Sequence, residues 1–225
     1  MDFIYGMTQG FLAPQGYYLS AEGEKSVERL KEHGVNFVAL VVNQFLETFH
    51  STRIFPLNSR TQDDDELALH IDRLHKAGIR VMLKPMIDPL DSVWRGNIRQ
   101  YRGIRIFADI DSDTVTPWFL SYREFINRYA KLAEKCQCEF FCAGCELDGM
   151  EEHSAEWSET IRQIRELYHG TVITIRQLIL NSGITENGSK KLIWSAFPAT
   201  SKLVPMTVPL HLKRCGRAGF HGWKN

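Results

Sequence analysis

A cluster of carboxylates follows an apolar stretch in the middle of the chain, in the segment EFFCAGCELDGMEE at Glu139–Glu152. By the two-residue period of a β-strand, every second side chain from Phe140 to Glu146 should share one face, so that a line of small and apolar residues ends in an acid. A carboxylate in that position is partly desolvated, which raises its pKa and suits it to donate a proton near neutral pH. Glu146 is therefore our first candidate for acid–base chemistry. The alternative is a solvated acid in a loop or at a helix cap.

A second apolar stretch, RVMLKPMIDPL at Arg80–Leu90, carries two ionisable residues. Lys84 and Asp88 are four residues apart, so a strand would point both side chains the same way. A structural ion pair at the end of the core would explain them, and so would a polar site fed by several strand ends. The next segment, Asp91–Asp113, lacks clear periodicity, and loops of that length are usually functional. It contains four aromatic or polar residues of interest: Trp94, Arg95, Asn97 and Tyr101.

Cysteines lie at positions 136, 138, 142, 145 and 215. An odd number, in a chain that shows no secretion signal, argues against a disulfide framework. A zinc ribbon usually has two CxxC pairs separated by a longer loop, and a strand would point Cys142 and Cys145 to opposite faces. We therefore expect buried thiols, no metal and no cofactor. A metal site formed by Cys136, Cys138, Cys142 and Cys145 is the rival hypothesis.

Strands and helices alternate along the sequence in a way that would position these side chains. Apolar runs predict strands that start near residues 3, 36, 80 and 139. Apolar residues at helical spacing predict a helix after each strand. The four helices are expected to follow Ser20, Thr61, Thr116 and Ser154, with Ser20 and Thr61 as N-caps. The polar candidates all fall at carboxyl ends of strands, which favours a parallel α/β protein and, within that class, a (β/α)8 barrel.

Composition is that of a globular protein: 225 residues, 44% hydrophobic and 24% charged, with a formal net charge of zero. The 55 residues after Gly170 carry eight Lys and Arg residues and one acid, Glu186. Because these cations are scattered, we expect no nucleic-acid partner. No run approaches the ~18 apolar residues of a membrane span, and MDFIYGMTQG does not resemble a secretion signal. We expect no membrane partner and a cytoplasmic location.

Several blocks within about residues 3 to 170 resemble glycoside hydrolase family 113. They are GYYLSAEGEKSVERLKEHGVNFVALVVNQF, FHSTRIFP, RVMLKPMIDPLDSVWRGNI, DSDTVTPWFLSYREFI and CAGCELDGMEEHSAEW. The family contains retaining endo-β-1,4-mannanases on a TIM barrel, with the acid/base after strand four and the nucleophile after strand seven. The resemblance implies that Glu146 is the acid/base, although Cys145 stands where the clan usually has Asn. It also implies a sugar cleft lined by Asn43, Gln44, Lys84, Asp88, Trp94 and Asp148, with Trp94 stacking on a pyranose ring.

The end of the chain departs from the family. We expect residues 1–170 to form the first four to five βα units of an incomplete (β/α)8 barrel, and interpret residues 171–225 as an irregular, basic tail of a truncated or frameshifted product. A retaining glycosidase needs two carboxylates ~5 to 5.5 Å apart, and the surroundings of Glu186 do not resemble the nucleophile segment. The resemblance thus predicts cleavage of β-1,4-mannan or manno-oligosaccharides, but no turnover by this chain alone. The alternatives are a β-1,4-xylanase or glucanase, and a non-catalytic sugar-binding fragment.

Overall fold

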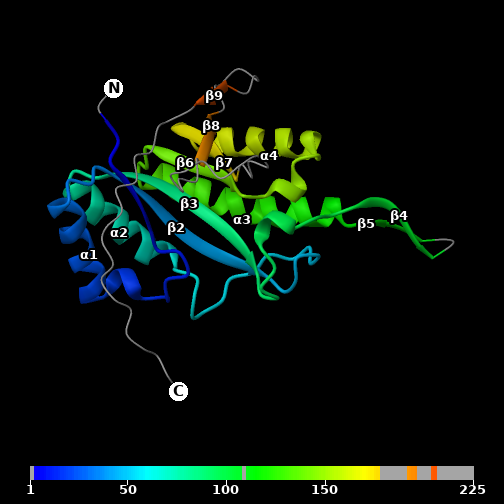
Figure 1. Ribbon diagram of the computed structural model, residues 1–225, viewed down its shortest axis with the longest axis horizontal. Helices are drawn as coiled ribbons and strands as arrows, with labels where there is room; N and C mark the ends of the chain where they lie inside the picture. The colour runs from blue at the N-terminus through cyan, green and yellow to red at the C-terminus, as the bar shows by residue number, and fades with distance from the viewer. Residues whose placement is uncertain (1–2, 108–109, 178–191, 197–203, 207–225) are drawn as a thin grey trace, which may run out of the picture.

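The computed structural model describes residues 3–107, 110–177, 192–196 and 204–206. A seven-stranded sheet with the order β1-β2-β3-β6-β7-β8-β9 forms its centre. The strands are β1 (Gly6–Gln9), β2 (Phe37–Leu46), β3 (Arg80–Pro89), β6 (Phe140–Cys145), β7 (Thr171–Gln177), β8 (Leu192–Ala196) and β9 (Val204–Met206). Figure 1 shows the helices packed along this sheet, with α1 and α2 near β2, and α3 and α4 near β6 and β7.

The helices in these ranges are α1 (Ala21–Glu32), α2 (Asp64–Lys76), α3 (Val115–Lys135) and α4 (Ser154–Leu167). Three short 3-10 helices accompany them: η1 (Tyr17–Leu19), η2 (Arg95–Asn97) and η3 (Asp148–Met150). Across the described part of the chain, no helix has both the length and the apolar character that crossing a membrane would require.

Five parallel strands lie side by side in chain order: β1, β2, β3, β6 and β7. One of the helices α1 to α4 connects each of these strands to the next. β2 and β3 pair over their whole length, from Phe37 opposite Arg80 to Leu46 opposite Pro89. This arrangement confirms the predicted strand and helix alternation and fits the first five units of a (β/α)8 barrel. The sheet continues through β7, past the boundary expected at Gly170. β8 then pairs with β7, and β9 with β8, in the antiparallel sense, unlike barrel strands.

Each face of the sheet carries its own apolar cluster, because side chains alternate along β2 and β3. On one face, residues such as Leu40, Leu83 and Phe141 pack against the helices. The other face corresponds to the interior of a barrel. Its cluster consists of Phe37, Ala39, Val41, Met82, Met86, Cys142, Cys145, Ile173 and Ile175.

Helix caps agree with the sequence at α1 and differ at α2. Ser20 caps α1 as predicted, since its hydroxyl accepts a hydrogen bond from the Gly23 amide at 3.2 Å. Asp63, not Thr61, caps α2, and its carboxylate accepts from the Glu66 amide at 2.7 Å. The Thr61 hydroxyl instead donates to the Asn43 carbonyl at 2.7 Å. Thr61 thus fastens the loop before α2 to the end of β2.

The segment Asp91–Asp113 is more regular than its sequence indicates. It contains η2 and a hairpin formed by β4 (Arg102–Phe107) and β5 (Ile110–Asp113), which projects from the body in Figure 1. Arg102 at the base of this hairpin forms an ion pair with Glu156 of α4 at 2.6 Å. Glu156 also pairs with Arg123 of α3. One carboxylate therefore connects the hairpin to both helices that pack beside β6.

Candidate active site

Polar side chains from three neighbouring strands meet at the carboxyl edge of the sheet. Asn43 of β2 donates from its amide to Asp88 of β3 at 2.6 Å. Arg95 of η2 binds the other Asp88 oxygen through Nε at 3.0 Å, and also through Nη2. The remaining guanidinium nitrogen, Nη1, donates to Glu146 Oε2 at 2.8 Å. Asn43, Asp88, Arg95 and Glu146 thus form one connected polar cluster.

Arg95 is the member of this cluster that sequence reasoning did not select as a site residue. Its side chain is only 8% exposed, and Nε also donates to the Ile87 carbonyl at 3.2 Å. A buried cation is tolerated only when it is paired and hydrogen-bonded, and two carboxylates supply that here. The ion pair considered for Lys84 and Asp88 is not what the described residues form, because Asp88 pairs with Arg95. The sequence did contain a signal for this arginine. Asp88 and Glu146 end at one edge of the sheet, and two partly buried acids need a cation, which the polar loop after Asp88 can supply.

Glu146 stands directly after β6, with its side chain 21% exposed, and has a left-handed backbone conformation with φ of 55°. Its amide donates to the Ile175 carbonyl of β7 at 2.8 Å, which anchors the residue to the next strand. A non-glycine residue with positive φ is uncommon and is found disproportionately at functional sites. The backbone therefore sets the direction in which this carboxylate leaves the sheet.

A β-bulge between Cys142 and Gly144 changes the alternation in β6. A Cβ added to Gly144 would lie 3.6 Å from both Trp157 and Tyr122, so Gly144 faces the helices. Cys145 returns to the barrel-interior cluster beside Cys142. The predictions that Gly144 shares a face with Cys142, and that Cys142 and Cys145 point apart, are both wrong. The extra residue of a bulge shifts every later side chain to the other face.

The edge of the Trp94 indole faces Glu146. Its indole nitrogen is 3.5 Å from Glu146 Oε2, and the side chain is half-buried. The ring packs directly against Gly96, where an added Cβ would come within 2.3 Å of it. Gly96 thus leaves room for the indole beside Glu146.

Lys84 is buried on the barrel-interior face, with a hydrogen bond to Cys145. Burial raises the pKa of the Cys145 thiol, against the opposing effect of the Lys84 ammonium. Burial also raises the pKa of Cys142 to about 12, with Cys145 as a second cause. Both thiols are protonated at neutral pH and are poor metal ligands in that form.

The four cysteines of the rival metal site do not converge. Cys138 is buried in the helix-facing cluster, and Cys136 packs against the same cluster, on the face opposite Cys142 and Cys145. Within the described ranges, no group of three or more His, Cys, Asp or Glu side chains is arranged to hold a metal ion. Cys215, like the tail acid Glu186, lies outside the described residues.

Gln44 and Asp148 complete the predicted set. Gln44 is not brought to the polar cluster: it points to the helix side of β2, where its amide donates to the Tyr129 hydroxyl of α3 at 3.3 Å. Asp148 begins η3, two residues after Glu146, and is half-buried. η3 packs against η2, since a Cβ on Gly149 would lie 2.3 Å from the Ile98 carbonyl. Asp148 therefore stands on the turn next to the one that carries Arg95.

Comparisons with a family model and with solved structures both point to one family. The model of Glycoside Hydrolase Family 113 matches residues 7–183. A solved GH113 β-1,4-mannanase and a complex of a GH113 β-1,4-mannanase are each 34% identical, with a TM-score of 0.68. Each alignment covers 76% of this chain and 55% of the solved one. The GH113 β-mannanase AaManA from Alicyclobacillus acidocaldarius, in complex with ManMIm, is 35% identical, with a TM-score of 0.69 and coverages of 76% and 54%.

The chain therefore spans about half the length of these solved structures. The family match continues thirteen residues past Gly170, in agreement with the sheet, which continues through β7. No curated protein matches the sequence.

Proposed function

This chain belongs to glycoside hydrolase family 113, and we propose that its polar cluster is the acid/base side of a retaining site for β-1,4-mannan or manno-oligosaccharides. The observation that carries the proposal is the placement of Glu146. It follows the fourth parallel strand, counted from β1, and is held by Arg95 and Trp94 at the carboxyl edge, where barrel enzymes carry their catalytic groups. The β-mannanases among the solved structures support mannan as the substrate.

The two oxygens of Glu146 have different surroundings. Arg95 and Trp94 both donate to Oε2, and within the described residues no side chain hydrogen bond is made to Oε1. Oε1 is therefore the atom that would protonate the glycosidic oxygen and later remove a proton from water. Fixing one oxygen while the other remains available holds the acid in a defined orientation toward the substrate.

A retaining glycosidase also needs a nucleophile ~5 to 5.5 Å from the acid/base, with the sugar between the two carboxylates. Asp88 is the other carboxylate of the cluster, but the Arg95 guanidinium lies between it and Glu146. The space between these two carboxylates is filled by the guanidinium and cannot hold the sugar, so we do not assign Asp88 as the nucleophile. We propose that Asp88, with Asn43, orients Arg95 and the sugar, and that this chain alone binds mannan without cleaving it.

Calorimetric titration of the chain with mannohexaose, xylohexaose and cellohexaose tests the proposal. We expect mannohexaose to bind most tightly and Trp94→Ala to weaken it by about tenfold, the cost of losing one stacking contact. Tyr101→Ala, which removes a surface aromatic at the base of the hairpin, is the matched control. The proposal fails if mannohexaose does not bind, and tighter binding of a xylan or glucan oligomer would assign the alternative specificity.

A reducing-sugar assay on mannan tests the second part of the proposal separately. We expect no product from the 225-residue chain. Product formation that Glu146→Gln abolishes would keep the acid/base assignment and disprove the conclusion about the nucleophile.

A further inference from the structure

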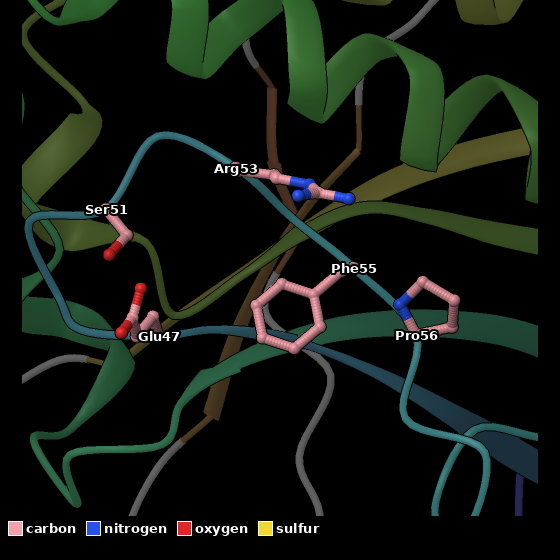
Figure 2. Close-up of a pocket in the computed structure, with 5 residues that line it drawn as sticks. All are labelled: Glu47, Ser51, Arg53, Phe55 and Pro56. Carbon is pink, nitrogen blue, oxygen red and sulfur yellow. The ribbon is translucent and has the colours of Figure 1, made fainter.

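A hollow of about 390 Å³ opens at the carboxyl end of β2 and shares no residue with the polar cluster. Ligand pockets in proteins typically measure ~300–1,000 Å³, so its size is that of a small binding site. Figure 2 shows the Phe55 ring between Glu47 and Pro56, with Arg53 across from it. The lining residues are Glu47, Ser51, Arg53, Phe55 and Pro56.

The hollow lies beside the polar cluster because its loop folds back along β2. Phe45 and Phe55 exchange two backbone hydrogen bonds of 2.9 Å, which adds one antiparallel bridge at the end of the strand. Phe45 of β2 in turn lies opposite Asp88 of β3. With strands ~4.8 Å apart, the backbone of Phe55 is about 10 Å from that of Asp88. A chain of a few linked sugar rings can span this separation.

The wall of the hollow is held by contacts from three other segments. The Ile54 amide donates to Ser121 Oγ of α3 at 2.8 Å, and the Phe49 amide donates to Asp91 at 3.0 Å. The Gln100 side chain donates to the carbonyls of His50 and Ser51 at 3.2 and 3.3 Å. The loop is thus organised before a ligand arrives, which lowers the entropy that binding would cost.

Side chains in the hollow suit an uncharged, hydroxyl-rich ligand. Phe55 and Pro56 supply an apolar surface, while Glu47 and Arg53 are exposed. Among the described residues, neither of these two charged side chains has an ion pair or a hydrogen bond. Glu47 can accept hydrogen bonds and Arg53 can donate up to five. Their charges offset each other, which disfavours an ionic ligand and leaves both free to bind hydroxyl groups.

We propose that this hollow is a second sugar subsite, which binds one neutral pyranose unit of the same β-1,4-linked chain that reaches Glu146. Phe55 supports the face of the ring, and Glu47 and Arg53 bind its hydroxyls. The subsite rests on the proposed function, since it extends the same substrate away from the acid. Its role is to favour long oligosaccharides over short ones.

Calorimetric titration of the chain with mannobiose and mannohexaose measures this preference without requiring catalysis. Phe55→Ala should weaken mannohexaose binding about tenfold, which is about 1.4 kcal/mol, and leave mannobiose binding unchanged. Arg53→Met is a second variant at an exposed position where folding is not at risk, and it should weaken mannohexaose binding severalfold. Leu69→Ala, at an exposed apolar position on α2, is the matched control and should bind as the unmodified chain does.

The outcomes separate this inference from the proposed function. Failure of the unmodified chain to bind either sugar would overturn both. Equal affinity for mannobiose and mannohexaose, or mannohexaose binding that neither variant weakens, would overturn the subsite and leave the acid/base assignment standing. Equal losses for both sugars in Arg53→Met would likewise overturn it, because the hollow would then be part of the central site.

Discussion

Acidification should destabilise the folded chain through one buried residue, His70 of α2. Its imidazole is fully buried and stacks on Tyr18 with ring centroids 4.3 Å apart. Nε2 lies 2.9 Å from Gln9 Oε1, whereas Nδ1 has no partner among the described residues. Burial lowers the pKa of His70 from 6.5 to about 4, and the Arg73 guanidinium acts in the same direction. The folded state therefore holds this histidine neutral.

The sign and size of the effect follow from proton linkage. Above pH 6.5 the ring is neutral in both states, so pH has no effect through His70. Between pH 6.5 and 4 the unfolded chain binds a proton that the folded chain does not, so stability falls as pH falls. Each pKa unit corresponds to about 1.4 kcal/mol, which gives a loss of about 3 kcal/mol by pH 4. Below that pH both states are protonated and the loss levels off.

Urea denaturation of the chain and of His70→Gln between pH 4 and 8 measures this term. Gln does not titrate and can still donate to Gln9, so the difference in unfolding free energy between the two proteins should change by about 3 kcal/mol over this range. His33→Gln, the same substitution at an exposed position at the end of α1, is the matched control. Parallel curves for the unmodified chain and His70→Gln would refute the reasoning.

Three further changes test the site and its support. Gly96→Ala places a methyl group within 2.3 Å of the Trp94 ring, and should weaken mannohexaose binding about tenfold, seen by calorimetry. Glu156→Gln removes the acid that pairs with Arg102 and Arg123, whose hydrogen bonds lower the pKa of Glu156. Urea denaturation should show a loss of about 1 kcal/mol of stability at pH 7, and this loss should shrink below pH 4.5, where Glu156 itself becomes protonated. In a barrel completed with the second half of the Alicyclobacillus acidocaldarius β-mannanase, Glu146→Gln should lower mannan turnover by about 100-fold. Formation of the glycosyl-enzyme from dinitrophenyl mannosides should be spared, and azide should restore their turnover; equal losses without azide rescue would contradict the acid/base role.

Much of the fold could be predicted because β2 and β3 are buried on both faces, which makes their sequences nearly continuous in apolar residues. Their parallel pairing then brings Asn43 and Asp88 to one edge. The same alternation that directs Asn43 to the cluster sends Gln44 to the helices, so the two neighbours could not both line a cleft.

Other parts of the site follow from contacts that alternation does not encode. Arg95 lies in a segment without periodicity, and its importance comes from two acids, Asp88 seven residues before it and Glu146 51 residues after it. The bulge in β6 was signalled only by Gly144, a residue type often found at bulges. The sequence offers two good cap residues for α2, Thr61 and Asp63, and does not distinguish them. In the structure the Thr61 hydroxyl bonds to the Asn43 carbonyl, and Asp63 caps the helix.

The ion pairs of Arg95 have a consequence for the order in which the chain folds. Fewer residues separate β2 from β3 than separate β3 from β6, whose connection contains the hairpin and α3, so we expect β2 and β3 to pair first. Until β6 arrives, Arg95 has Asp88 as its only acidic partner in this cluster. If β6 docks after β2 and β3 have paired, its docking brings Glu146 to Arg95 and completes the pairing of the guanidinium in one step. We therefore expect Glu146 to reach the polar cluster late in folding, and a folding rate measured at Trp94, which lies beside it, should report that step.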